Sequence, residues 1–182
     1  GVVASVTRIA AGSGPDDGEA GGIVIAPGFV DLRAHLREPG NEDAETVATA
    51  QAAAAHGGFT TIVAAADTDP APDEPGVVER VRAAASASGS PVRVLAWGAL
   101  TAGRHGETLA ALGELGDAGV VGFGDAPASV RSPALFRNAL LYAGALGLPV
   151  AETPDDPGYG AGAEAHEGYV AAVLGLRGAP AA

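Results

Sequence analysis

The sequence alternates short apolar runs with alanine-rich stretches, and this alternation constrains the fold more than any other feature. The apolar runs contain β-branched residues and end near glycine, proline or aspartate, which is typical of buried strands. They are Phe29–Leu32, Thr60–Ala65, Val92–Trp97, Val120–Phe123 and Leu148–Ala151. Strands that alternate with helices indicate βα units around a parallel sheet, so the sequence predicts an α/β fold.

Helix start and stop residues support the same interpretation. Ser132-Pro133 combines an N-cap residue with a proline in the first helical position, and Gly147 suits the position just past the end of that helix. Comparable signals predict helices at Ala44–His56, Gly76–Ser88, Glu107–Asp117, Ala134–Leu146 and Glu164–Leu174. Each predicted helix follows one of the predicted strands.

The N-terminal part of the chain does not follow this pattern. Val2–Ile9 and Ile23–Ala26 are short strand-like runs, joined by a loop rich in glycine, aspartate and proline. We interpret residues 1–26 as part of a small β domain and residues 27–182 as the βα region. A (β/α)₈ barrel needs eight strands and about 250 residues, more than this chain supplies. The periodicity leaves two possibilities open, a doubly wound open sheet or an incomplete barrel.

Charge and composition exclude several classes of function. The 182 residues include ten arginines, no lysine and 22 acidic residues, for a formal charge of −12, which disfavours nucleic-acid binding. The absence of lysine and cysteine excludes Schiff-base lysines, carbamylated-lysine metal bridges, P-loops, thiolate zinc sites and thiol nucleophiles. No apolar run approaches the roughly 18 residues of a membrane span, and no secretory signal pattern is visible. We expect a cytoplasmic protein without nucleic-acid or membrane partners.

Three basic side chains gather where the first strand ends. Arg33, His35 and Arg37 lie at alternate positions, so we expect them to point the same way. Ligands of parallel α/β folds bind at this edge of the sheet. Two fixed cations beside one imidazole oppose a divalent metal and suit an anion better. Equally open is a structural role, in which the arginines pair with Asp31, Glu38 or Asp67.

Acidic residues follow the later strands. Asp67-Thr68-Asp69-Pro70 comes directly after the second strand and could supply an acid/base pair or hard-metal ligands, although turn chemistry is the more common use of this pattern. Asp125 follows the fourth strand and Glu152 the fifth, where either residue could simply begin a loop. His56, His105 and His166 lie apart from these clusters.

Several of these segments together resemble one family. The segments are Ala26-Pro27-Gly28-Phe29-Val30-Asp31, His35-Leu36-Arg37-Glu38-Pro39-Gly40, Gly57-Gly58-Phe59-Thr60-Thr61, Asp67-Thr68-Asp69-Pro70, Gly98-Ala99-Leu100-Thr101, Ala118-Gly119-Val120-Val121-Gly122-Phe123 and His166-Glu167-Gly168 with Leu174-Gly175-Leu176. In this order they resemble the dihydroorotases, which are cyclic amidohydrolases. The resemblance implies a TIM-like (β/α) barrel of the amidohydrolase type, with a small β domain and one or two zinc ions at the C-terminal edge of the strands. It also implies that this chain holds about five of the eight strands and is a fragment, or the ordered part, of a chain about twice as long.

The resemblance assigns metal-ligand positions to four residues, two of which have changed. The H-x-H motif of the family here is Arg33-Ala34-His35, so a cation replaces the first imidazole, and Thr153 stands where the family has a histidine. His35 and Asp125 match ligands that are retained. A hydrolytic zinc ion needs about three protein ligands and a water molecule. We therefore expect no cofactor.

The resemblance also assigns two substrate-binding positions. Arg37 matches the arginine that holds the substrate carboxylate, and Asp67 stands where an asparagine assists it. An aspartate there repels the carboxylate unless Arg33 neutralises it. We expect the Arg33 guanidinium to bridge Asp67 and Asp125 in place of the lost metal, because a planar fork of donors suits two carboxylates.

These departures resemble the pseudo-dihydroorotases, which are non-catalytic relatives. The leading hypothesis is a pseudoenzyme of pyrimidine biosynthesis that assembles with aspartate carbamoyltransferase catalytic chains in a hetero-oligomer. The alternative is an active zinc dihydroorotase that hydrolyses the cyclic amide of dihydroorotate to carbamoyl-aspartate. A third possibility is a binding module in which Arg33 and Arg37 hold a small carboxylate without turnover.

Overall fold

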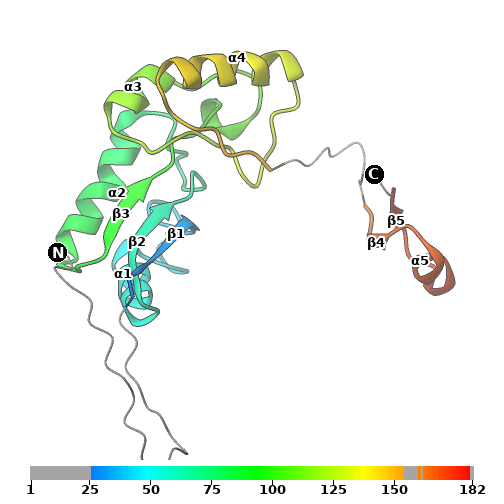
Figure 1. The fold of residues 1–182 in the computed structure, drawn as a ribbon, viewed down its shortest axis with the longest axis horizontal. Helices are drawn as coiled ribbons and strands as arrows, with labels where there is room; N and C mark the ends of the chain where they lie inside the picture. The colour runs from blue at the N-terminus through cyan, green and yellow to red at the C-terminus, as the bar shows by residue number, and fades with distance from the viewer. Residues whose placement is uncertain (1–25, 154–159, 161, 181–182) are drawn as a thin grey trace, which may run out of the picture.

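A computed structural model describes residues 26–153, 160 and 162–180 (Figure 1). The predicted small β domain, residues 1–26, lies almost entirely outside the described residues. No helix in the described ranges is both long enough and apolar enough to cross a bilayer.

A parallel sheet organises the main part of the chain. It contains β1 (Phe29–Ala34), β2 (Phe59–Ala64) and β3 (Arg93–Ala96), in the order β1-β2-β3. Ile62 on the central strand pairs with Asp31 on one side and with Val94 on the other. The predicted parallel α/β arrangement is confirmed for these strands.

The predicted fourth and fifth strands are present as single parallel bridges instead of full ladders. Phe123 bridges to Gly98 on one side and to Val150 on the other. The amide of Gly124 donates to the carbonyl of Gly98 at 3.0 Å, and the amide of Ala151 donates to the carbonyl of Phe123 at 2.8 Å. The parallel order therefore continues past β3, although a closed barrel is not present among the described residues.

A close approach of backbones explains why glycine flanks Phe123. A Cβ atom on Gly122 would lie 2.3 Å from the Trp97 ring and 2.6 Å from the carbonyl oxygen of Pro149. A Cβ atom on Gly124 would lie 2.5 Å from the carbonyl oxygen of Ala151. No side chain fits at either position without a shift of the neighbouring segment.

The helices follow the strands as predicted, with shifted boundaries. They are α1 (Val47–His56), α2 (Pro75–Ala87), the short 3₁₀ helix η1 (Ala102–Arg104), α3 (Leu112–Asp117) and α4 (Pro133–Ala145). Helix α1 begins three residues later than predicted because Thr46 caps it: the Thr46 hydroxyl accepts a hydrogen bond from the amide of Thr49 at 3.2 Å. Ser132 caps α4 through the amide of Leu135 at 3.2 Å, as its sequence signal predicted.

Helix α3 is shorter than the predicted helix Glu107–Asp117 for a tertiary reason. Leu109 forms an antiparallel bridge with Thr101, so the chain before Leu112 is extended. The pairing of these two segments brings residues that follow β3 against the start of α3. Helix propensity did not reveal this contact.

Two buried clusters hold the helices on the sheet. The first contains Phe123, Leu100, Leu112 and Leu115, each fully buried, and Ala139 of α4 packs in the same cluster. The second surrounds Ile62 of β2 and joins it to α1 and α2; its buried members are Leu36, Val47, Ile62, Ala64, Val81 and Val92. Full burial of one large apolar side chain typically contributes about 1.5–3 kcal/mol to the free energy of folding, so these two clusters are the main source of stability for the sheet and its helices.

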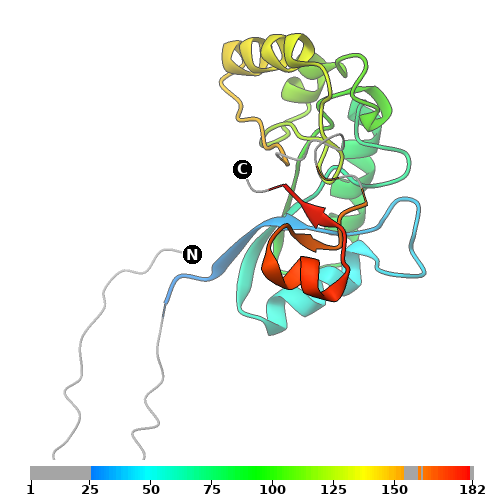
Figure 2. The ribbon, with the colours of Figure 1, turned by 90° about the vertical axis from the view of Figure 1, so that its right-hand side faces the viewer.

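The C-terminal part of the chain forms a small β-α-β unit. It contains β4 (Ala165–His166), α5 (Tyr169–Leu174) and β5 (Gly178–Ala179), and the two strands are parallel (Figure 2). The helix predicted at Glu164–Leu174 is therefore wrong at its N-terminal end. The backbone of Gly178 packs so closely on Glu167 that an added Cβ would lie 2.6 Å from the Glu167 Cα, so a side chain does not fit at this position without a shift of the neighbouring strand.

Candidate functional site

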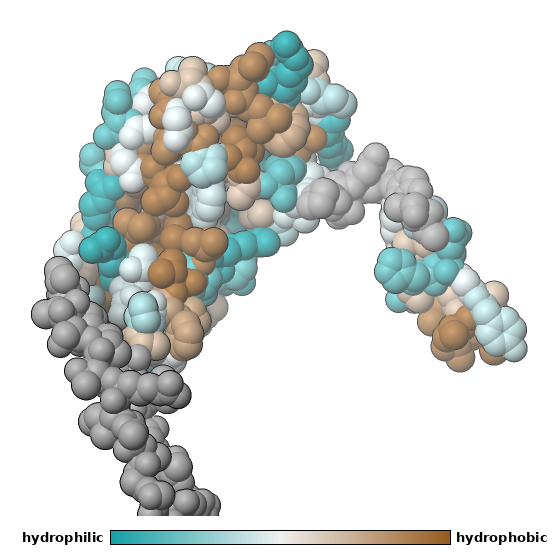
Figure 3. Space-filling model, in the orientation of Figure 1, coloured by the Kyte–Doolittle hydropathy of each residue, from teal (hydrophilic) through white to brown (hydrophobic). Residues whose placement is uncertain are grey.

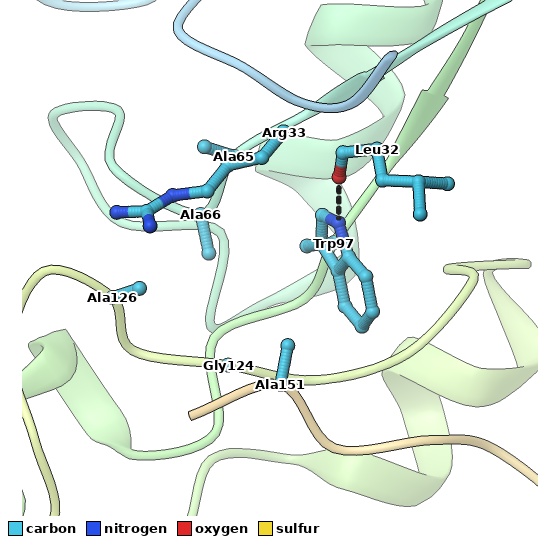
Figure 4. Close-up of a pocket in the computed structure, with 8 residues that line it drawn as sticks. All are labelled: Leu32, Arg33, Ala65, Ala66, Trp97, Gly124, Ala126 and Ala151. Atoms are coloured by element: carbon cyan, nitrogen blue, oxygen red, sulfur yellow. Dashed lines mark hydrogen bonds between the residues drawn. The ribbon is translucent and has the colours of Figure 1, made fainter. Parts of the chain in front are cut away.

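The C-terminal ends of the parallel segments surround a cavity of about 330 Å³ (Figure 4). Strands β1, β2 and β3 and the two bridged segments that follow them, at residues 120–123 and 148–151, all contribute to its wall, either themselves or through the residue directly after them. The lining residues are Leu32, Arg33, Ala65, Ala66, Trp97, Gly124, Ala126 and Ala151. This is the edge at which the sequence placed the candidate ligand-binding residues, and Arg33 is the one charged residue of the lining.

Trp97 forms one side of the cavity and was not predicted as a site residue. Its indole Nε1–H donates to the carbonyl of Leu32 at 2.8 Å, and its backbone amide donates to the carbonyl of Ala64 at 3.0 Å. These two bonds fix the ring between the end of β3 and the end of β1 (Figure 4). The available signal was that this residue, the sole tryptophan of the chain, falls at the end of a predicted strand.

Asp67 joins two of the three basic residues that follow β1. The Nδ1 atom of His35 lies 2.5 Å from Oδ2 of Asp67, and an Nη atom of Arg37 lies 3.6 Å from the same oxygen. The Asp67 side chain is 7% exposed, whereas those of His35 and Arg37 are each 42% exposed. The structural pairing of an arginine with Asp67, left open by the sequence, is present, and it uses Arg37.

Arg37 reaches this position through an unusual backbone conformation. Its φ angle is +61°, in the left-handed region of backbone conformation that residues other than glycine and asparagine rarely adopt. The Arg37 carbonyl accepts a hydrogen bond from the amide of Asn41 at 2.8 Å, which closes the turn after β1. The backbone therefore carries a conformational cost at the residue that faces Asp67.

Asp125 is fully buried, and both of its oxygens are used by neutral donors. Oδ1 accepts from the amides of Leu100 at 2.8 Å and Thr101 at 3.1 Å, and Oδ2 accepts from the Thr101 hydroxyl. The Thr101 hydroxyl oxygen in turn accepts from the amide of Gly106 at 2.9 Å. Asp125 thus connects the end of the bridged segment 120–123 to the loop that follows β3.

Arg33 does not bridge the two carboxylates, so that expectation was wrong. Within the described ranges, the ion pairs of Asp67 are with His35 and Arg37, and Arg33 has none within 4.0 Å. Arg33 is exposed and lines the cavity, and its backbone amide donates to Oδ1 of Asp31 at 2.8 Å. Asp125 is directed into the protein instead, toward the amide donors of the neighbouring loop.

Glu152 is a half-buried acid beside this edge. Its Oε1 accepts a hydrogen bond from the amide of Val130 at 3.0 Å, and its Oε2 is buried without a hydrogen-bond partner among the described residues. Burial raises the pKa of the Glu152 carboxyl, the charge of Asp125 raises it further, and the bond from Val130 acts in the opposite direction. The sequence placed Glu152 at a loop start and had no signal for the burial of its Oε2 atom.

Arg104 fixes the loop after β3 to the loop after β2. Its Nη1 donates to the carbonyl of Ala66 at 3.1 Å, and its Nε is buried without a partner in the described part of the chain. The adjacent amide of Gly103 donates to Asp73 Oδ2 at 2.7 Å. The sequence carries no signal for this contact, because Gly103-Arg104 has the composition of an ordinary turn.

The described residues do not fit a hydrolytic zinc ion. In these ranges no group of three or more His, Cys, Asp or Glu side chains is placed to hold a metal. The Nδ1 atom of His35 contacts Asp67, which leaves Nε2 as its one nitrogen for a ligand, and the oxygens of Asp125 are occupied by Leu100 and Thr101. Thr153 is half-buried at the end of the segment 26–153 and offers one weak hydroxyl ligand.

Comparison with known proteins places the chain among sequences of one kind. A family model described as Dihydro-orotase-like matches residues 22–182. A dihydroorotase of Pelotomaculum thermopropionicum is 42% identical over 163 residues, which cover 90% of this chain and 38% of that protein. A dihydroorotase of Anaeromyxobacter sp. (strain K) is 47% identical over 156 residues, 86% of this chain and 36% of that protein. A dihydroorotase of Mycobacterium tuberculosis is 45% identical over 166 residues, 90% of this chain and 38% of that protein. The chain thus spans well under half the length of these relatives.

Proposed function

The chain belongs to the dihydroorotase-like family, and from this premise we propose that it serves pyrimidine biosynthesis as a non-catalytic member. The proposed role is structural: the protein assembles with aspartate carbamoyltransferase catalytic chains and supports their oligomer. It needs no zinc ion and does not hydrolyse dihydroorotate.

The state of Asp125 carries the non-catalytic part of the proposal. A carboxylate that is to bind a metal must present an oxygen to the open side of the site. Asp125 is fully buried and accepts three hydrogen bonds from Leu100 and Thr101. Recruiting it as a ligand would leave those donors unsatisfied, at a cost of about 1–3 kcal/mol for each group.

The replacements at the other ligand positions support the same conclusion. Arg33 places a permanent cation at the cavity, where it opposes a divalent ion electrostatically. Thr153 supplies a neutral hydroxyl in place of an imidazole. Arg37, the position that would hold a substrate carboxylate, is already paired with Asp67. Catalysis would therefore require changes at several independent positions.

An active zinc dihydroorotase is the second candidate, because relatives that are 42% and 47% identical to this chain are named dihydroorotase. Metal content and turnover distinguish the two candidates. We expect the purified full-length protein to hold much less than one zinc ion per chain and to show no conversion between dihydroorotate and carbamoyl-aspartate in either direction. One tightly held zinc ion per chain together with turnover would overturn the non-catalytic proposal.

Exposed apolar side chains support a role in assembly. Leu140, Leu141 and Tyr142 on α4 are 46–59% exposed, and Figure 3 shows apolar surface over this helix. Contiguous exposed apolar residues are a common mark of interaction surfaces. The test is size-exclusion chromatography of the full-length protein with and without aspartate carbamoyltransferase. We expect the two proteins to elute together, and separate elution at micromolar concentrations would contradict the proposed partner.

A further inference from the structure

We propose that the cavity at the strand ends binds a small carboxylate with an apolar body, which Arg33 recognises through its guanidinium group. Ligand-binding cavities have volumes of about 300–1,000 Å³, and this cavity of about 330 Å³ lies at the lower end of that range. It therefore suits a ligand about the size of one substituted ring. This proposal does not depend on the proposed assembly role.

The cavity separates a charged side from an apolar side. Figure 4 shows the Arg33 guanidinium and the Trp97 indole on opposite sides of the space, with small side chains between them. The small residues are Ala65, Ala66, Gly124, Ala126 and Ala151. Because the indole N–H already donates to Leu32, the ring presents an apolar surface to the cavity, without a free donor.

Among the described residues, Arg33 is the charged member of the cavity lining, and it has no ion pair within 4.0 Å. His35 and Arg37 both contact Asp67, and Asp125 is buried and satisfied by Leu100 and Thr101. The guanidinium presents a planar fork of donors that matches the two oxygens of a carboxylate. Apolar surroundings on one side strengthen the attraction relative to open water.

The chemistry of the lining narrows the class of ligand. Apart from Arg33, the lining side chains carry no charge, and the one side-chain donor among them, the Trp97 indole, is occupied. A ligand rich in amide groups would bury donors and acceptors without partners, which costs about 1–3 kcal/mol for each group. An aromatic or branched aliphatic monocarboxylate satisfies both sides of the cavity.

The test uses phenylacetate as the probe and its neutral isostere phenylacetamide as the matched ligand. Isothermal titration calorimetry on the full-length protein is expected to show phenylacetate binding at least about tenfold more tightly than phenylacetamide. Equal affinity for the two probes, or no phenylacetate binding up to several millimolar, would overturn the proposal. If the folded protein did not bind phenylacetate, the proposed assembly with aspartate carbamoyltransferase would be unaffected.

Variants locate the binding site. Arg33→Gln removes the cation and should weaken phenylacetate binding about tenfold, with little effect on phenylacetamide. Ala151→Leu should weaken both probes, because Ala151 is exposed and lines the cavity, so the larger side chain fills the space without disturbing the core.

Two control variants separate Arg33 from other cations. Arg93→Gln changes an exposed arginine at the start of β3, outside the cavity lining, and should leave binding unchanged. Arg37→Gln tests the alternative position for the carboxylate, and it should weaken phenylacetate binding much less than Arg33→Gln does, because Arg37 is paired with Asp67. Loss of binding in Arg37→Gln that equals the loss in Arg33→Gln would place the carboxylate at Arg37 and overturn the assignment.

Discussion

The Nδ1 atom of His35 lies 2.5 Å from Oδ2 of Asp67 and is thereby occupied by a neighbouring side chain. Arg37 approaches the same oxygen from a second direction at 3.6 Å. Two positions with different expected roles, a metal ligand and a substrate contact, thus share one carboxylate. Both contacts use Oδ2 of Asp67, whereas its Oδ1 is buried without a hydrogen-bond partner among the described residues, and together they hold the turn after β1 beside the loop after β2.

Removing this shared carboxylate should destabilise the protein. In Asp67→Ala, Arg37 and His35 lose their common partner, and the largely buried position of Asp67 limits replacement by water. Because both partners are 42% exposed, we expect a loss of about 1–2 kcal/mol in the free energy of unfolding. The urea midpoint measures it, with Asp69→Ala at an exposed acid two residues away as the control. Equal shifts in the two variants would show that the cluster contributes no stability.

Asp125 and Arg33 should differ strongly in their effect on stability. Asp125→Ala leaves the amides of Leu100 and Thr101 without their buried acceptor, so we expect a loss of about 3 kcal/mol or more. Arg33→Ala removes an exposed side chain and should cost less than about 1 kcal/mol. Urea unfolding of both variants, with Arg93→Ala as the surface control, tests this order. A larger loss for Arg33→Ala than for Asp125→Ala would restore the idea that Arg33 replaces a metal.

Restoring the two imidazoles should not by itself restore a zinc site. Arg33→His with Thr153→His returns the ligand types, but Asp125 still accepts its hydrogen bonds from Leu100 and Thr101. We expect zinc well below one ion per chain after dialysis, measured by elemental analysis. Adding Thr101→Val removes the hydroxyl that donates to Oδ2 of Asp125 and should raise the zinc content. Stoichiometric zinc in the double variant would show that Asp125 is free to turn outward.

Glu152 should make the folded protein less stable at neutral pH than at mildly acidic pH. Burial and Asp125 raise its pKa above 4.5, so the folded state binds this proton more tightly than the unfolded state does. The cost is therefore fully present above the raised pKa and disappears as the pH falls toward 4.5.

Glu152→Gln tests this contribution while keeping an acceptor for the Val130 amide. We expect the variant to be more stable than the parent protein at pH 7 by less than about 1 kcal/mol, since solvent screens part of the effect. The difference in urea midpoint should shrink as the pH is lowered. A difference that stays constant between pH 7 and pH 4 would indicate that the charge of Glu152 is not its source.

A charge placed among the exposed apolar residues of α4 (Leu140, Leu141 and Tyr142) should weaken the proposed assembly. Leu141 is 59% exposed, so Leu141→Asp should preserve the fold and lower the fraction that elutes with aspartate carbamoyltransferase at least about tenfold. Asn138→Asp adds the same charge at an exposed polar position of the same helix and serves as the matched control. Equal loss in both variants would indicate a general charge effect, and no loss in either would exclude α4 from the contact.

The local elements were largely predictable because their signals lie within a few residues. Ser132 and Pro133 marked the start of α4, and the apolar run Thr60–Ala65 marked β2, since capping and hydrophobic periodicity act over single turns and strands. Predictions failed where a distant segment competed. The start of α3 is extended because Leu109 pairs with Thr101, and residues 165–166 pair with β5 instead of beginning a helix.

The sequence determined which chemical groups stand at the ends of the strands, since the order of βα units places Arg33, Asp67 and Asp125 at one edge. It did not determine which of these groups meet. Asp67 takes its partner His35 from 32 positions away, and Asp125 turns to donors 24 and 25 positions away. Charge attraction alone would allow Arg33 to bind either carboxylate. The folded backbone instead offers Asp125 three nearby donors and directs Arg33 to the cavity, because hydrogen-bond geometry and burial depend on distances that exist only after the segments have packed.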